Sequence, residues 1–232
     1  MPDQPKAPLL RRSFLTRAGI AAAAIGVGGG SIASAQSSGS RFQPERHPQD
    51  DWFDTVPGKH RLYLDALTGG GAGEALLFAA NFLNNNKQAY NLADSDSAVV
   101  ICFRHFATPF AWTDPIWAKY GEAFTEYLTK IKDPKTTKAP NVNMYRIAGY
   151  GMQLPNLGNT IDDLVKRGVQ FAVCDTATHF TAGQIAEMTK GDAAAIYKDL
   201  TSNTIPSSRY VSAGIVATNR AQERSYTIAH CG

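Results

Sequence analysis

The chain has 232 residues and a formal net charge of +3, with 44% hydrophobic and 19% charged residues. All of this net charge lies within residues 1–35, which hold four basic side chains and one acidic side chain. The rest of the chain is therefore close to neutral and has no cluster of lysine or arginine. These properties exclude a charge-driven nucleic-acid partner, and the length suits one domain with its own core.

Residues 1–35 have the three-part pattern of an export signal. Arg11 and Arg12 precede Ser-Phe-Leu, a mildly apolar run of alanine and glycine follows, and Ala33-Ser34-Ala35 ends the segment. The pattern resembles a twin-arginine (Tat) signal, which a receptor reads and which does not anchor the protein. The alternatives are an ordinary secretory signal and an uncleaved N-terminal anchor. We expect cleavage after Ala35, a periplasmic protein and no membrane anchor after cleavage.

Residues 36–58 are polar, contain prolines and show no hydrophobic period. This composition predicts a flexible linker that Trp52 and Phe53 dock onto the folded part. The folded domain then comprises residues 59–232.

Strands and helices alternate along this domain. The predicted strands are 60–67, 97–106, 141–149, 168–174, 207–214 and 225–231. The predicted helices lie at about 76–83, 114–131, 160–167, 181–200 (with a break near 191–192) and 215–223. The alternation predicts the α/β class: a single three-layer domain with a mainly parallel sheet of five to six strands and helices on both faces.

Three cysteines, Cys102, Cys174 and Cys231, are too few for a disulfide framework, and their odd number leaves at least one thiol free in a monomer. Cys102 lies within an apolar run and is predicted to belong to the core. Cys231, next to the end of the sequence, is predicted to be a mobile surface thiol. Cys174 ends a buried strand, where sites form in parallel sheets.

Two segments of the second half, "DDLVKRGVQFAVCDTATHF" and "IPSSRYVSAGIVATNRAQERSYTIAH", carry a resemblance to a known family. They are similar to the DsrE/TusD/YchN-like proteins of the DsrEFH superfamily, and the resemblance covers residues 62–228. It implies a compact α/β domain assembled as a homotrimer or homohexamer. In the sulfur-relay members, the cysteine at the position of Cys174 accepts sulfane sulfur as a persulfide, which implies a sulfur-donor or acceptor protein as partner.

This chain departs from the family in two respects. The relay proteins are mostly cytoplasmic, whereas this chain has the pattern of an exported protein. Segments near 112–117 and 132–141 are insertions relative to the small family core.

The candidate catalytic residues are Cys174, His179, Arg104 and His105. Backbone amides at the start of a following helix would stabilise a Cys174 thiolate; the alternative is a thiol that only packs. The two histidines would form a thiol–imidazole cluster with it, or only make loop hydrogen bonds. Arg104 would steer a sulfur oxyanion, or pair with Asp175. The cysteine and histidine spacings do not match a metal finger, and the sequence assigns no cofactor.

Two further stretches have structural alternatives. The glycine-rich segment 68–75 offers helix amides to an anion, or makes a tight turn with close packing, which we favour. Phe106, Phe110 and Trp112 have no role on a predicted helix. They would form an apolar lid or a subunit contact, and we favour the contact.

The sequence therefore predicts an exported persulfide carrier. The alternative is a non-catalytic periplasmic binding or scaffold protein that holds a metal, a haem or a small anion. The sequence does not decide whether the protein is an enzyme.

Overall fold

A computed structural model describes residues 43–232, and the predicted export signal lies outside these residues. Five strands form one sheet, in the order β4-β3-β2-β1-β5, and every neighbouring pair is parallel. The strands are β1 His60–Ala66, β2 Ser97–Phe103, β3 Gln170–Cys174, β4 Ser208–Val211 and β5 Thr227–Cys231. The predicted α/β class with a parallel sheet is confirmed.

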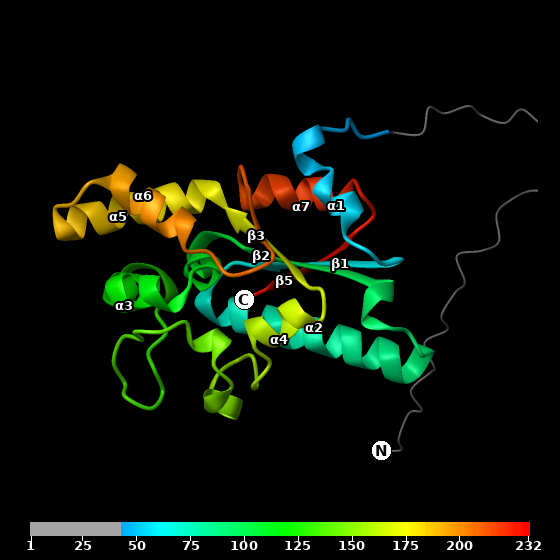
Figure 1. Cartoon of the computed structure of the whole chain (residues 1–232), viewed down its shortest axis with the longest axis horizontal. Coiled ribbons are helices and arrows are strands. Elements are labelled where there is room, and N and C mark those ends of the chain that lie inside the picture. Colours follow the sequence, from blue (N-terminus) through cyan, green and yellow to red (C-terminus); the bar gives the residue numbers. More distant parts are fainter. Residues whose placement is uncertain (1–42) are drawn as a thin grey trace, which may run out of the picture. The chain divides into compact units, whose positions relative to one another are not determined.

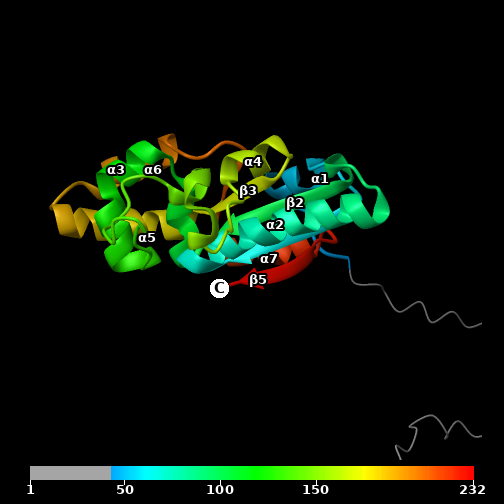
Figure 2. The ribbon, with the colours of Figure 1, turned by 90° about the horizontal axis from the view of Figure 1, so that it is seen from below.

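Seven α-helices accompany the sheet in the described part of the chain. They are α1 Trp52–Thr55, α2 Gly69–Tyr90, α3 Asp114–Ala123, α4 Ile161–Lys166, α5 Asp175–Thr189, α6 Ala193–Ser202 and α7 Gly214–Gln222. The helices α2 and α4 cover one face of the sheet, and α1 and α7 cover the other (Figures 1 and 2). None of these helices is both long and apolar enough to cross a membrane.

Side chains that alternate along the strands fill two core layers. Leu64, Ile101 and Phe171 pack under α2, whereas Tyr63 and Cys102 pack under α1 and α7. Every residue of β2 is buried, because both faces of this central strand are covered by helices. The unbroken apolar run in the sequence predicted this burial.

The predicted strand at 141–149 is wrong. The segment forms the 3-10 turns η5 Met144–Arg146 and η6 Ala148–Gln153. The Asn143 side chain fixes the turn: its amide donates to the carbonyls of Phe110 and Trp112, both at 2.9 Å, and its oxygen accepts from the Tyr145 N–H. Tyr145 is buried against the start of α2, so its apolar character reflects packing and not strand pairing.

The helices α5 and α6 form a hairpin beyond the carboxyl ends of the strands (Figure 1). No loop separates Cys174 from Asp175, so α5 continues outward from β3. The helix therefore begins six residues earlier than predicted, at Asp175 in place of Thr181. The predicted break is present, because Lys190 adopts a left-handed backbone and ends α5.

The segment before β1 packs on the sheet through two aromatic residues. Trp52 and Phe53 are buried, as predicted, and the Tyr226 hydroxyl donates to the Phe53 carbonyl at 2.7 Å. The buried Arg224 guanidinium pairs with Asp51 and Asp54, each at 3.3 Å. The segment therefore covers, together with α7, one face of the sheet.

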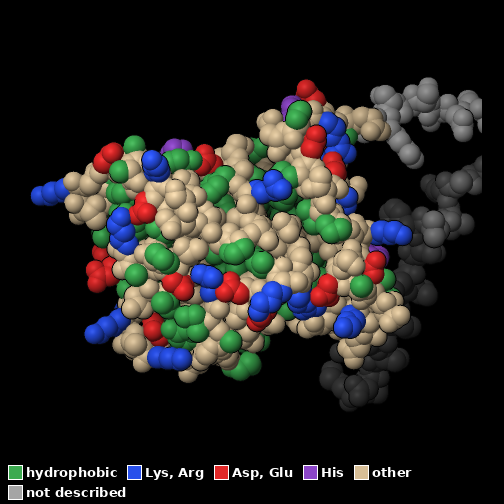
Figure 3. Space-filling model, viewed as in Figure 1, with side chains coloured by type: hydrophobic (Ala, Val, Ile, Leu, Met, Phe, Trp, Pro, Cys, Tyr) green, Lys and Arg blue, Asp and Glu red, His purple; other side chains and the backbone are tan. Residues whose placement is uncertain are grey.

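On the face shown in Figure 3, basic and acidic side chains are interspersed and form no patch of one sign. This distribution agrees with the near-neutral charge of residues 36–232.

Candidate functional site

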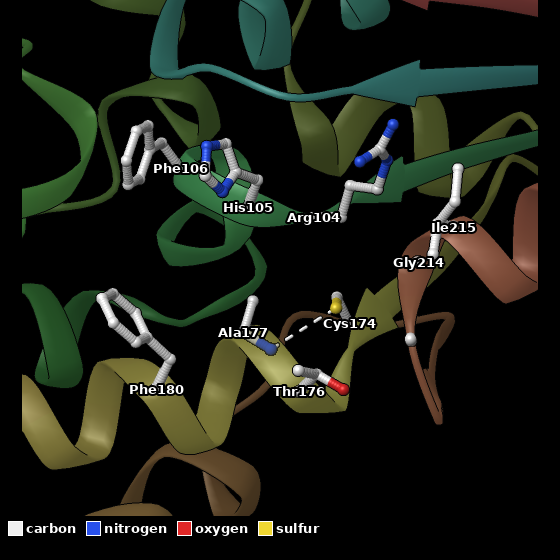
Figure 4. Close-up of a pocket in the computed structure, with 10 residues that line it drawn as sticks. Arg104, His105, Phe106, Cys174, Thr176, Ala177, Phe180, Gly214 and Ile215 are labelled. Carbon is white, nitrogen blue, oxygen red and sulfur yellow. Dashed lines mark hydrogen bonds between the residues drawn. The ribbon is translucent and has the colours of Figure 1, made fainter.

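A pocket of about 440 Å³ opens at the carboxyl ends of β2, β3 and β4 (Figure 4). It is lined by residues that follow these strands: Arg104, His105, Phe106, Cys174, Thr176, Ala177, Phe180, Ala213, Gly214 and Ile215. Parallel strands bring these segments together although they are far apart in the sequence. Pockets of this size at this edge of an α/β sheet are typical ligand sites.

Cys174 is the last residue of β3 and the N-cap of α5. Its Sγ accepts a hydrogen bond from the Ala177 N–H at 3.4 Å, and its side chain borders the pocket (Figure 4). The Thr178 hydroxyl donates to the Cys174 carbonyl at 2.9 Å. The thiol is therefore held at the positive end of a fifteen-residue helix, where a negative charge on sulfur is stabilised.

Arg104 is bound to Asp65 through two parallel hydrogen bonds, from Nε at 2.6 Å and from Nη2 at 2.9 Å. Asp65, on β1, is fully buried, and His230 Nδ1 lies 2.8 Å from its second oxygen. The hydrogen bond with Asp65 raises the pKa of Arg104. The alternative partner considered for Arg104, Asp175, is wrong: Asp175 accepts from the Tyr197 hydroxyl at 2.7 Å.

His105 lies on the pocket wall opposite Cys174 (Figure 4). It is exposed, and its ring stacks on Phe106 with 3.8 Å between ring centroids. Its φ of +54° is in the left-handed region, which costs a residue other than glycine about 1 kcal/mol. The Phe106 N–H, which donates to the Leu67 carbonyl at 2.9 Å, holds the chain in this turn.

His179 does not line the pocket. Its ring stacks on Tyr197 of α6, with centroids 3.9 Å apart and planes at 6°, and its Nε2 lies 3.6 Å from Asp175. Because α5 begins directly after Cys174, five residues place His179 about 140° around the helix. The structure thus brings together Arg104, His105 and Cys174, but not His179.

Several lining residues have no role in the sequence-based prediction, and Gly214, Phe180 and Ile215 are the most informative of them. A Cβ on Gly214 would lie 2.5 Å from both Cβ and Cδ of Arg104, so only glycine lets this side chain pass. Phe180 and Ile215 border the pocket with 54% and 60% of their surface exposed. One signal in the sequence pointed to the pairing of Arg104: Asp65 lies within the apolar strand "LYLDA". A carboxylate buried there needs a cation as partner.

The other two cysteines lie in the core. Cys102 is fully buried, as predicted, and burial raises the pKa of its thiol. The prediction of a mobile surface thiol at Cys231 is wrong, because this residue of β5 pairs with Ala66 of β1 and is 1% exposed. Burial raises the pKa of Cys231 to about 12.

The predicted subunit contact of the aromatic residues is wrong for Phe110 and Trp112. Both are fully buried, Phe110 against Tyr145 and Trp112 against Phe124. Phe106 is half-buried on the pocket wall.

The glycine-rich segment serves close packing. Thr68 caps α2, and a Cβ on Gly73 would lie 2.7 Å from the Tyr145 hydroxyl oxygen. None of residues 68–75 lines the pocket.

Among residues 43–232, no group of three or more histidine, cysteine, aspartate or glutamate side chains is placed to hold a metal ion. Comparisons with protein-family models, with curated proteins and with solved structures found no match to this chain.

Proposed function

We propose that the protein carries sulfane sulfur on Cys174. The observation that supports this most directly is the position of its Sγ, at the N-terminus of α5 and beside the pocket. Of the three cysteines, only Cys174 lines this pocket. The resemblance to the DsrE-like sulfur carriers assigns the same role to the same residue.

The transfer needs no oxidant or reductant beyond the donor. The Cys174 thiolate attacks the outer sulfur of a persulfide R–S–SH, so that a new S–S bond forms and the S–S bond of the donor breaks. The leaving thiolate takes up the proton that Cys174 lost, and the products are Cys174–S–SH and R–SH. An acceptor thiolate then attacks the outer sulfur and releases Cys174.

The neighbouring side chains have separate roles in this proposal. The amide of Ala177 stabilises the sulfur anion, and the His105 imidazole on the opposite wall can take up the thiol proton and return it to the leaving group. Arg104 forms part of the wall, because its charge is already paired with Asp65.

The test uses the chain from Gln36 to Gly232, incubated with polysulfide and analysed by mass spectrometry after digestion. We expect the mass of one sulfur atom on the peptide that contains Cys174, and none after Cys174→Ser. Cys231→Ser is the matched control and should retain the addition on Cys174. Sulfur only on Cys231, or on no cysteine, would contradict the proposal.

The alternative role, a binding or scaffold protein for a metal, a haem or a small anion, is tested on a different sample. It requires a stoichiometric metal or a Soret band in protein purified from its native export route. Elemental analysis and an absorption spectrum measure both.

We propose further that the protein is exported through the twin-arginine route and acts in the periplasm. This rests on the pattern of residues 1–35, which lie outside the described residues. N-terminal sequencing of the mature protein should begin at Gln36. Replacement of Arg11 and Arg12 by lysine should leave the precursor in the cytoplasm; unchanged export would argue for the general secretory route.

A further inference from the structure

The pocket offers no uncompensated lysine or arginine. Arg104 is the only lysine or arginine among the lining residues. Both carboxylate oxygens of Asp65 accept hydrogen bonds from it. A fully buried carboxylate requires a paired cation, so Asp65 holds the guanidinium firmly. An oxyanion with two negative charges, such as thiosulfate, would therefore meet an arginine whose charge is already balanced by Asp65.

The walls that face the open space are mostly apolar. Phe106 lies on one side, and Ala177 and Phe180 lie on α5 opposite (Figure 4). Ile215, at the start of α7, completes the wall. Phe180 and Ile215 leave more than half of their surface exposed to water. An apolar ligand in the pocket would cover these two side chains.

From the paired charge, the apolar walls and the thiol we infer the class of the sulfur donor: a small apolar organic persulfide, with an alkyl or aryl group. This inference rests on the proposed function. The organic group lies between Phe106, Phe180 and Ile215, and its outer sulfur faces Cys174 Sγ. The volume of about 440 Å³ accommodates a group of the size of a benzyl ring.

The transfer follows the balance given above, with R as the apolar group. The S–S bond of the donor breaks, the S–S bond on Cys174 forms, and the apolar thiol R–SH leaves the pocket. No additional reactant takes part.

The first experiment measures binding without sulfur chemistry. Benzyl methyl sulfide, an unreactive thioether, is titrated into the Cys174→Ser chain and followed by NMR. Ile215→Asp places a charge in the apolar wall and should weaken binding at least about tenfold. Val216→Asp is the matched control: this neighbour on α7 is 41% exposed but does not line the pocket, so binding should change less than about twofold.

The second experiment compares the rates at which different donors load Cys174 at one fixed pH. Benzyl persulfide should load Cys174 at least about tenfold faster than thiosulfate or glutathione persulfide, and Ile215→Asp should remove most of this preference. Equal or faster loading by thiosulfate would overturn the inference, as would absence of thioether binding. If no donor loads Cys174, the carrier function itself fails, while thioether binding still decides whether the pocket takes an apolar ligand.

Discussion

Cys102 and Cys174 lie on the same face of neighbouring strands, yet their surroundings differ. Cys102 is enclosed between Tyr63 and the helices above it, whereas Cys174 stands at a strand end beside the pocket. We predict that Cys174→Ser leaves stability nearly unchanged. Cys102→Ser should lower the free energy of unfolding by roughly 1–3 kcal/mol, because it replaces a fully buried sulfur beside the Tyr63 hydroxyl with a smaller and more polar group. Urea denaturation of both variants measures the difference.

Thiol labelling of the native protein complements this prediction. Cys174 should react faster than Cys102 and Cys231, both of which are nearly inaccessible. An inert Cys174, with a serine variant that unfolds at lower denaturant than wild type, would show that this residue only packs.

Gly214 determines where the Arg104 side chain lies in the site. Gly214→Ala should push the Arg104 stem out of its place against α7 and cost roughly 1–3 kcal/mol of stability through overpacking. A matched control is Gly183→Ala on α5, where an added Cβ meets no atom within 4 Å. Equal thermal unfolding of the two variants would show that Arg104 moves without cost.

At the scale of elements, we expect the short helix α1 to contribute much to the free energy of unfolding, through the core that it forms with α7 and the sheet. Phe53 is fully buried and contacts Trp52, Tyr63 and Tyr226. We predict that Phe53→Ala costs about 3–5 kcal/mol, measured by chemical denaturation. Phe78→Ala on the exposed side of α2, with Phe78 42% exposed, should change stability by less than about 1 kcal/mol. Similar losses in both variants would contradict this account.

The elements that could be predicted are those whose own residues determine them. β2 has a continuous apolar run, and Thr160 and Gly168 mark the two ends of α4 and its following turn. The segment 141–149 could not be predicted, because its turn depends on Asn143 binding carbonyls some thirty residues away.

The same distinction holds for the site. Arg104, His105 and Cys174 could be predicted to meet, because each follows a parallel strand and such strand ends share one edge. Which side of α5 faces the pocket depends on the helix starting directly at Asp175. A start at Thr181 gave no basis for separating Phe180, which lines the pocket, from His179, which stacks on α6.

For the whole molecule we predict a homo-oligomer, a trimer or hexamer, from the resemblance to the DsrE-like proteins. Phe110 and Trp112 do not support this prediction, because both lie in the core. Light scattering of the chain from Gln36 at micromolar concentration should give three or six times the mass of one chain. The mass of a single chain would contradict the prediction.

The position of β5 beside β1 has a consequence for the order of folding. Asp65 and His230, which meet across these two strands, are 165 residues apart in the sequence. A ribosome therefore releases β1 through β4 before the strand that completes the sheet, and parallel pairing over such distances is slow. Until β5 arrives, β1 has an unpaired edge open to other chains. Because this pairing buries Cys231, protection of its thiol would report when β5 has joined the sheet.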